Sequence, residues 1–182
     1  MTYTYYLHAG SSDIQTIGPP FDKIRILARE TMSTPPSETF TVPGGSSINL
    51  YFLTPEGTPS SDNWEDGGTF TCEWSLSTTS VQLRTRVRVG RVDTNTSTIV
   101  QLGAFTAFKT HAASTVLTFT PTVPTWTDAE ESCRNRIIVQ YQINNTNPMN
   151  NRNFTVQFGS TDAEVISTIT EVNGTCRRIF NG

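Results

Sequence analysis

Three closely spaced arginines are the side chains of this 182-residue chain with the clearest capacity for chemistry. Arg84, Arg86 and Arg88 are two residues apart, and Arg91 follows closely. Residues two apart on an extended strand share one face, so the first three guanidinium groups are expected to form a row. Because a planar guanidinium group binds a carboxylate through two parallel hydrogen bonds, these four arginines predict a protein interface that docks on an acidic neighbouring subunit.

The distribution of charge leaves a second interpretation of the row open. From Glu30 to Leu83 there are seven acidic residues and no lysine or arginine, and the arginines follow at once. The row could therefore be a solvated strand face whose arginines pair across the sheet with Glu73 or another nearby acid. The sequence alone favours neither interpretation.

Catalytic groupings are hard to assemble from the remaining residues. His8 and His111 stand near no nucleophile motif, and the chain has neither a Gly-x-Ser-x-Gly turn nor a phosphate-binding glycine loop. The carboxylate pairs Glu65–Asp66 and Glu130–Glu131 are adjacent in sequence, so on a strand their side chains would point to opposite faces. We therefore expect structural histidines and no enzyme.

Metal and cofactor binding are also not expected. The acids around Trp64, in residues 59–69, offer oxygen atoms to calcium but lack the spacing of a known calcium loop, and Trp64 is better explained as an aromatic side chain that closes a sheet edge. The three cysteines, Cys72, Cys133 and Cys176, are an odd number without a CxxC pair, which fits neither a disulfide framework nor a zinc site.

Composition and charge narrow the class of partner. The formal net charge of -3 and the pI near 5.3 argue against a protein that neutralises phosphates, so no nucleic acid is expected. The first residues have no basic or apolar region of a secretory signal, and no apolar stretch approaches the roughly 18 residues that span a bilayer. We expect a protein without a membrane partner that stays in the compartment where it is made.

Alternation of apolar and polar residues with period two dominates the chain and predicts strands. The clearest runs are 48–52, 70–76, 83–89, 137–143 and 154–158, and weaker ones are 4–8, 24–29, 38–42, 98–102, 116–120 and 165–171. About ten short strands between Gly, Pro and Asn turns predict an all-β, single-domain antiparallel sandwich of two sheets over residues 1–182, jelly-roll-like in topology. Residues 127–131 predict one helical turn, and residues 173–182 a flexible tail.

The inward positions of these strands predict the core. Its expected members are Leu50, Phe52, Phe70, Trp74, Val87, Val89, Val139, Tyr141, Val156 and Phe158. Cys72 alternates in phase with Phe70 and Trp74, so its thiol is expected to be buried, protonated and unreactive, whereas Cys176 should react first.

Three stretches carry a family resemblance. They are Tyr5-Tyr6-Leu7 with Phe21-Asp22-Lys23, then Phe52-Leu53-Thr54-Pro55-Glu56-Gly57 leading into Trp64-Glu65-Asp66-Gly67-Gly68-Thr69-Phe70, and then Val87-Arg88-Val89-Gly90-Arg91-Val92. In this order they resemble a diffuse family of structural proteins of phages and metagenomic viruses, over the first half well and the rest loosely. The resemblance implies a β-sandwich module of the virion surface and brings no catalytic or ligand residue.

This resemblance leads to the functional expectation. It implies a bacteriophage virion protein, made in the host bacterial cytoplasm, that decorates the outside of the head shell as a cement protein. Its partners would be the major capsid protein or other virion subunits. A small sandwich that coats a lattice needs weak contacts multiplied over copies, so a homo-oligomer is expected, with a trimer as the simplest case.

A different class of function is a glycan-binding module in a phage tail or adsorption apparatus. Trp64, Trp74 or Trp126 would then stack on sugar rings. Because Trp74 alternates in phase with the core positions, only two loop tryptophans remain for such a platform. Neighbouring genes for portal, protease and major capsid protein would favour decoration over adsorption.

Overall fold

The computed structural model describes residues 2–11, 24–28, 30–55, 70–75, 77, 80–93, 98–111, 116–122, 135–159 and 164–168. The elements in these ranges are all β-strands, which confirms the predicted all-β class. The expected helical turn at 127–131 and the tail at 173–182 lie outside these ranges, as do Trp64, Trp126, Cys133 and Cys176. Within the described ranges no helix is long and apolar enough to cross a membrane.

The strands are paired mainly into one long sheet. In chain order they are β1 (Thr2–Ser11), β2 (Ile24–Ala28), β3 (Ser37–Val42), β4 (Ser47–Leu53), β5 (Phe70–Ser75), β6 (Leu83–Asp93), β7 (Thr98–Leu102), β8 (Lys109–Thr110), β9 (Val116–Phe119), β10 (Asn135–Asn145), β11 (Arg152–Gln157) and β12 (Glu164–Thr168). The long sheet has the order β7-β6-β10-β4-β2-β1-β12-β5-β9, β8 also pairs with β6, and β3 pairs with β11 in a small second sheet.

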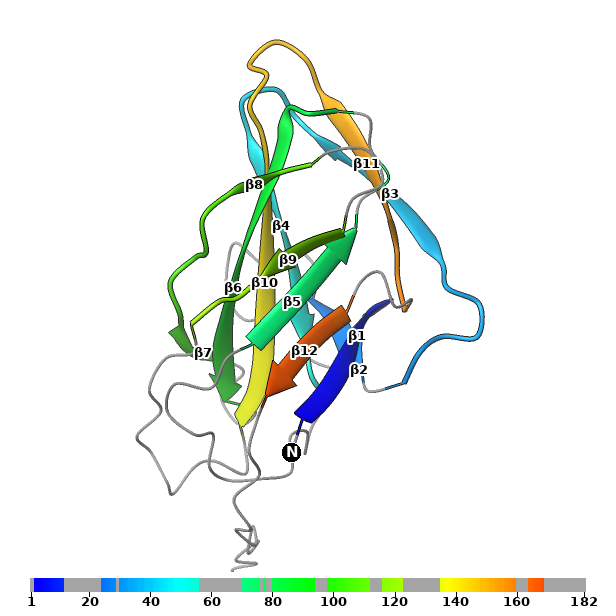
Figure 1. Cartoon of the computed structure of the whole chain (residues 1–182), viewed down its shortest axis with the longest axis vertical. Helices are drawn as coiled ribbons and strands as arrows, with labels where there is room; N and C mark the ends of the chain where they lie inside the picture. The colour runs from blue at the N-terminus through cyan, green and yellow to red at the C-terminus, as the bar shows by residue number, and fades with distance from the viewer. Residues whose placement is uncertain are drawn as a thin grey trace, which may run out of the picture.

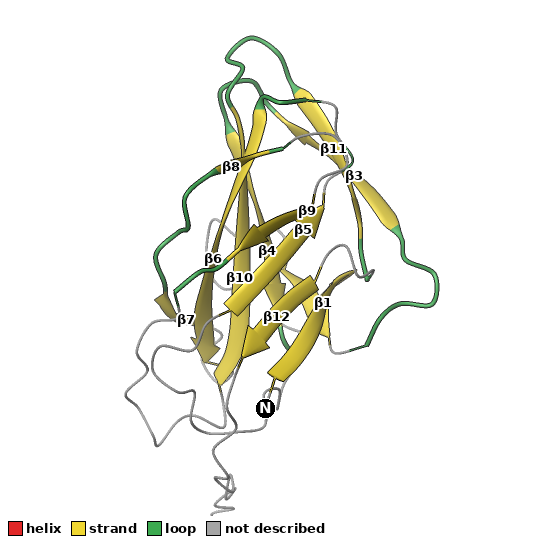
Figure 2. Ribbon diagram, in the orientation of Figure 1, coloured by secondary structure: helices red, strands yellow, loops and turns green. Residues whose placement is uncertain are grey.

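The long sheet folds back on itself to make the two layers of a sandwich. Strands β1, β12, β5 and β9 lie over β4, β10 and β6 (Figure 1), and the small β3–β11 sheet stands beside them (Figure 2). Early and late strands alternate, with β12 between β1 and β5 and β10 between β4 and β6, as a jelly-roll-like topology requires.

One strand pair departs from the antiparallel expectation. Strand β2 is antiparallel to β1 but parallel to β4, and this pair carries the sheet from one layer to the other. A parallel neighbour needs a crossover connection rather than a hairpin, and the β3 segment lies between β2 and β4 in the chain.

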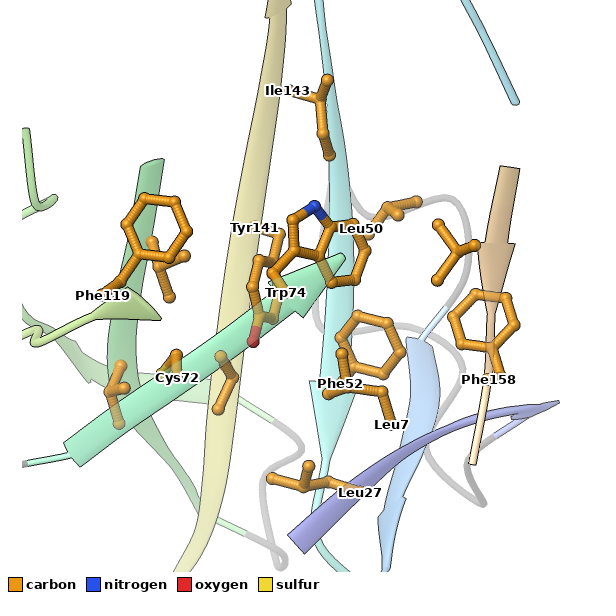
Figure 3. Close-up of a cluster of buried hydrophobic side chains, with 14 of the residues drawn as sticks. Leu7, Leu27, Leu50, Phe52, Cys72, Trp74, Phe119, Tyr141, Ile143 and Phe158 are labelled. Carbon is orange, nitrogen blue, oxygen red and sulfur yellow. The ribbon is translucent and has the colours of Figure 1, made fainter. Parts of the chain in front are cut away.

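The main core fills the space between the layers. All ten predicted core residues belong to it, and the Trp74 indole of β5 stacks on the Tyr141 ring of β10 with centroids 4.3 Å apart (Figure 3). Phe158, just after β11, packs against Phe52 of β4 at 6.0 Å between centroids. The predicted core is therefore confirmed, and the small sheet joins it through Val42, Phe154 and Val156, with Phe158 following β11.

A second apolar cluster lies on the other face of β4. Its buried members, which we term the outer apolar cluster, are Ile24, Tyr51, Leu53, Val92 and Ile138. Because Leu50 and Phe52 face the main core, the last four residues of β4 are buried on both sides of the strand. Strands covered on both faces lose the alternation of apolar and polar residues, and this explains the irregular pattern of residues 48–53.

Candidate interaction face

The pleat of β6 separates its side chains onto two faces. Leu83, Val87 and Val89 enter the main core, whereas the arginines at 84, 86 and 88 are partly buried on the outer surface. The two-residue repeat of an extended strand therefore aligns these three guanidinium groups in a row. We use the term arginine face for Arg84, Arg86 and Arg88 together with the side chains that contact them.

Neutral amides on β10 hold the arginines from one side. The register of β6 and β10 places an amide side chain opposite each arginine, and each arginine Nε donates to that amide oxygen. The pairs are Arg84–Asn144 at 2.9 Å, Arg86–Gln142 at 2.7 Å and Arg88–Gln140 at 2.5 Å. Each bond fixes a long side chain that would otherwise sample many rotamers.

Side chains of β4 accept hydrogen bonds from these amides, so the hydrogen-bonded side chains extend over three strands. The Gln140 Nε2 donates to Asn49 Oδ1 and to the Tyr51 hydroxyl, both at 3.0 Å. The Gln142 Nε2 donates to the same Asn49 oxygen at 3.2 Å, and the Asn144 Nδ2 donates to Ser47 Oγ at 3.0 Å. Gln140 is only 3% exposed, so its three bonds satisfy a buried amide and orient the oxygen toward Arg88.

Two phenylalanines complete the arginine face from the other side. The segment 103–108 runs along β6, where Gly103 N and Thr106 N donate to the carbonyls of Val89 and Val87, both at 2.9 Å. This places Phe105 and Phe108 beside the row.

Each ring contacts two neighbouring guanidinium groups of the row. The Phe108 ring centroid lies 4.3 Å from the Arg84 Cζ and 4.6 Å from the Arg86 Cζ. The Phe105 centroid lies 4.2 Å from the Arg86 Cζ and 4.3 Å from the Arg88 Cζ. Cation–π contacts at such exposed sites stabilise by about 0.5–1 kcal/mol each, so together they hold both the arginines and the 103–108 segment in place.

The outer ends of the three guanidinium groups face solvent. Among the described residues their Nη nitrogens donate no hydrogen bond and meet no carboxylate, yet none of them is a buried donor without a partner. Burial lowers the pKa of the Arg88 guanidinium, the interaction with Tyr51 raises it in part, and the positive charge of Arg86 lowers it again. Three cations thus stand side by side without an opposing charge in the described part of the chain.

The alternative pairing of this row with Glu73 is wrong. Glu73 lies on β5 in the other layer, where its carboxylate accepts a hydrogen bond from Thr118 at 3.5 Å. The ion pair found among the described residues joins Arg25 to Glu38 at 3.0 Å, away from this row. In-register neighbours on β10 are amides, so the strand pairing itself offers the arginines no acid.

Arg91 does not belong to the arginine face. It is 7% exposed and lies opposite Ile137, a main-core residue, on the inward side of β6. A separation of three residues from Arg88 places it on the other face of the pleat. The prediction of Arg91 as an interface residue therefore needs correction.

The amides and the phenylalanines were not predicted as part of this site. Gln140, Gln142 and Asn144 alternate with period two on a predicted strand, so a polar face was evident, but its pairing with the arginines depends on the order of strands in the sheet. Phe105 and Phe108 lie in a segment without alternation, and no local signal indicates where their rings point.

Both histidine rings have a polar partner within the fold. The His111 ring is buried, its Nε2 lies 2.6 Å from Thr85 Oγ1 on the inward side of β6, and burial lowers its pKa to about 4. The His8 Nε2 lies 2.8 Å from the carbonyl oxygen of Glu30.

Cys72 and Trp74 are inaccessible. Both side chains are fully buried in the main core, and burial raises the pKa of the Cys72 thiol. Trp74 therefore presents no surface for stacking on a sugar. Within the described ranges no three His, Cys, Asp or Glu side chains gather to hold a metal ion, and residues 59–69, where calcium was considered, lie outside them.

Comparison with known proteins identifies no relative of this chain. No family model and no curated protein matches the sequence. Structural likeness is found with a CocE/NonD family hydrolase from Staphylococcus aureus, at 8% identity and a TM-score of 0.44, covering 93% of this chain and 37% of the hydrolase chain. A protein of the infectious bursal disease virus Gx strain matches at 11% identity and a TM-score of 0.39, covering 91% of this chain and 50% of the viral chain.

A third likeness is with the Yersinia pseudotuberculosis-derived mitogen, at 10% identity and a TM-score of 0.30, covering 78% of this chain and 92% of the mitogen. The three proteins are a hydrolase, a virus protein and a mitogen, and all three TM-scores are below 0.5. These likenesses therefore identify neither a family nor an activity.

Proposed function

We propose that this chain is a non-enzymatic virion structural protein that attaches to neighbouring subunits through the arginine face. The finer form of the proposal is a bacteriophage decoration protein on the outside of the head shell, bound to the major capsid protein and assembled as a homo-oligomer. The sequence resemblance to phage structural proteins supports the virion role.

The single observation that carries the proposal is the preorganisation of the three guanidinium groups. Ordering long side chains at an interface costs about 0.5–1.5 kcal/mol for each, and here the amides and rings have already ordered them. The three cations are fixed close together with no acid opposite them. On a face exposed only to solvent their mutual repulsion would lower the stability of the fold, because like charges repel. An acidic partner surface would offset this repulsion.

The test measures attachment of the protein to undecorated shells made from the major capsid protein of the same genome. The triple variant Arg84→Gln, Arg86→Gln and Arg88→Gln should stay folded, since the opposite face of β6 supplies the core, and should lose about 3 kcal/mol of stability with the cation–π contacts and amide hydrogen bonds of the row. Co-sedimentation with shells should fall steeply, because removing one desolvated guanidinium–carboxylate pair from an interface costs on the order of 2 kcal/mol.

A control separates the arginine face from general positive charge. The double variant Lys109→Gln and Arg152→Gln removes two cations that do not contact the row, and it should co-sediment like the wild type. Unchanged binding by the triple variant would place the interface elsewhere. Absence of wild-type binding to shells, together with binding to host-envelope glycans, would favour the adsorption module instead.

A further inference from the structure

We infer that the arginine face binds an extended acidic segment of a neighbouring polypeptide, with carboxylates at alternate residues lying over Arg84, Arg86 and Arg88. This inference rests on the proposed function only in taking the neighbour to be a virion subunit. The occupant follows from the spacing, the orientation and the charge of the row.

Spacing favours an extended chain. Neighbouring arginines of the row are two residues apart on one strand, which is about 6.6–6.8 Å. Alternate side chains of any extended segment repeat at the same distance and on one side. Such a segment lying along β6 can therefore meet all three arginines in register. On a helix, side chains four residues apart repeat at about 6.0 Å but turn by about 40° around the axis at each step, so the third side chain points away from the row.

The orientation of the guanidinium groups favours carboxylates that approach each arginine from its two Nη nitrogens. A guanidinium group can hold two oxygens across its Nε and one Nη, or across its two Nη nitrogens. The amides of β10 already occupy each Nε, at 2.5–2.9 Å. Only the Nη pair remains, and it matches the planar fork of a carboxylate.

The contacts around the two rings disfavour the usual mode of single-stranded nucleic-acid binding. Such binding combines cations with aromatic faces on which bases stack. Here each ring already contacts two guanidinium groups, Phe108 those of Arg84 and Arg86 and Phe105 those of Arg86 and Arg88, which leaves less ring surface for a base. The net charge of -3 also opposes a polyphosphate ligand.

The experiment compares three fluorescent peptides of equal length, composition and charge. One has three glutamates at alternate positions among threonines, one has the three glutamates in a block, and one has them three residues apart. Binding to the full chain is measured by fluorescence anisotropy at about 0.15 M salt. We expect the alternating peptide to bind about tenfold or more tightly than either isomer, because it forms at least one further bidentate hydrogen-bond pair.

Variants test whether geometry or charge gives the preference. Arg86→Lys keeps the charge but loses the fork, the bond to Gln142 and the stacking on the rings, so the preference for the alternating peptide should disappear while weak salt-sensitive binding remains. Phe105→Leu with Phe108→Leu keeps all three charges and should reduce the preference to about threefold or less. Arg152→Gln should leave it unchanged.

The outcomes separate this inference from the proposed function. Equal binding of the three peptides, or tighter binding of a thymidine oligomer, would overturn the acidic-segment inference even if attachment to shells depends on the arginines. Preference for the alternating peptide without any binding to shells would support the inference and contradict the virion role. Loss of preference in Arg152→Gln would also overturn it, since that side chain bonds to Gln82 and to none of the three arginines.

Discussion

The outer surface of the β4–β10–β6 layer has two regions with the same backbone pairing and opposite chemistry. At one end the three strands carry the arginine face, which is partly buried and polar. Further along, the same strands carry the outer apolar cluster together with Ile24 of β2, and the members of this cluster are at most 3% exposed. Strands paired in one register can therefore carry a polar surface at one end and an apolar surface at the other.

Tyr51 stands at the junction of these two regions. It belongs to the outer apolar cluster, while its hydroxyl accepts a hydrogen bond from Gln140 at 3.0 Å. Leu53, Ile138 and Val92 continue the apolar end, and Asn49, Gln142 and Arg86 continue the polar end. We expect the first region to contribute to folding and the second to recognition, and substitutions can separate these contributions.

The largest effect on stability is expected in the apolar region. Ile138→Ala deletes buried methylene and methyl groups, so the free energy of unfolding should fall by about 2–5 kcal/mol. Urea denaturation followed by tryptophan fluorescence measures this change. Peptide binding by the folded protein should stay close to the wild type, and a selective loss of binding would break the division between the regions.

Protonation of His111 is expected to destabilise the inward side of β6. Its folded pKa of about 4 lies below the ordinary value of 6.5, so the neutral ring is the stable form in the fold. Stability is then fully present above pH 6.5 and is lost as the pH falls toward 4, by about 3 kcal/mol in total. Denaturation of wild type and His111→Gln at pH 7.5 and pH 4 isolates this contribution, and equal pH slopes would contradict it.

An intermediate effect is expected for the amide at the junction. Gln140→Leu leaves Arg88 Nε without its partner and removes one of the two hydrogen bonds that Asn49 Oδ1 accepts, so stability should fall by about 1–3 kcal/mol. Gln142→Leu, at a less buried position, should cost about 1 kcal/mol or less. Equal losses for the two variants, measured by urea denaturation, would show that burial at the junction does not matter.

The smallest effect on stability is expected in the arginine face. Arg86→Gln removes two cation–π interactions and a surface hydrogen bond, which together should cost about 1 kcal/mol. The same variant should lose most of the alternating-peptide binding. A loss of stability as large as that of Ile138→Ala would mean that the arginine face serves the fold rather than recognition.

Much of the fold could be predicted from local patterns, because a strand with one buried face has a two-residue signature. Trp74, Val87 and Tyr141 were assigned to the core on this basis and lie there. The burial of Leu53 was harder to predict, because a strand covered on both faces does not show the alternation of apolar and polar residues.

The site was predictable only in part, since its pieces are far apart in the chain. The outward direction of Arg86 follows from its position on the strand. Its partners Gln142 and Phe108 are brought to it by the order β6-β10 and by the path of residues 103–108, and no local rule specifies either. The sequence alone was enough to exclude Arg91 from the arginine face. It lies three residues after Arg88, and residues an odd number apart on a strand point to opposite faces.

The position of β12 between β1 and β5 affects how the chain is synthesised. Until residue 168 has left the ribosome, the layer lacks the strand that joins these two, and each keeps an open edge toward the gap. Open strand edges of a nascent chain recruit other strands and favour aggregation. Truncation before residue 164 should therefore yield insoluble product, and folding dominated by such distant pairings should be slow, on the millisecond-to-second scale.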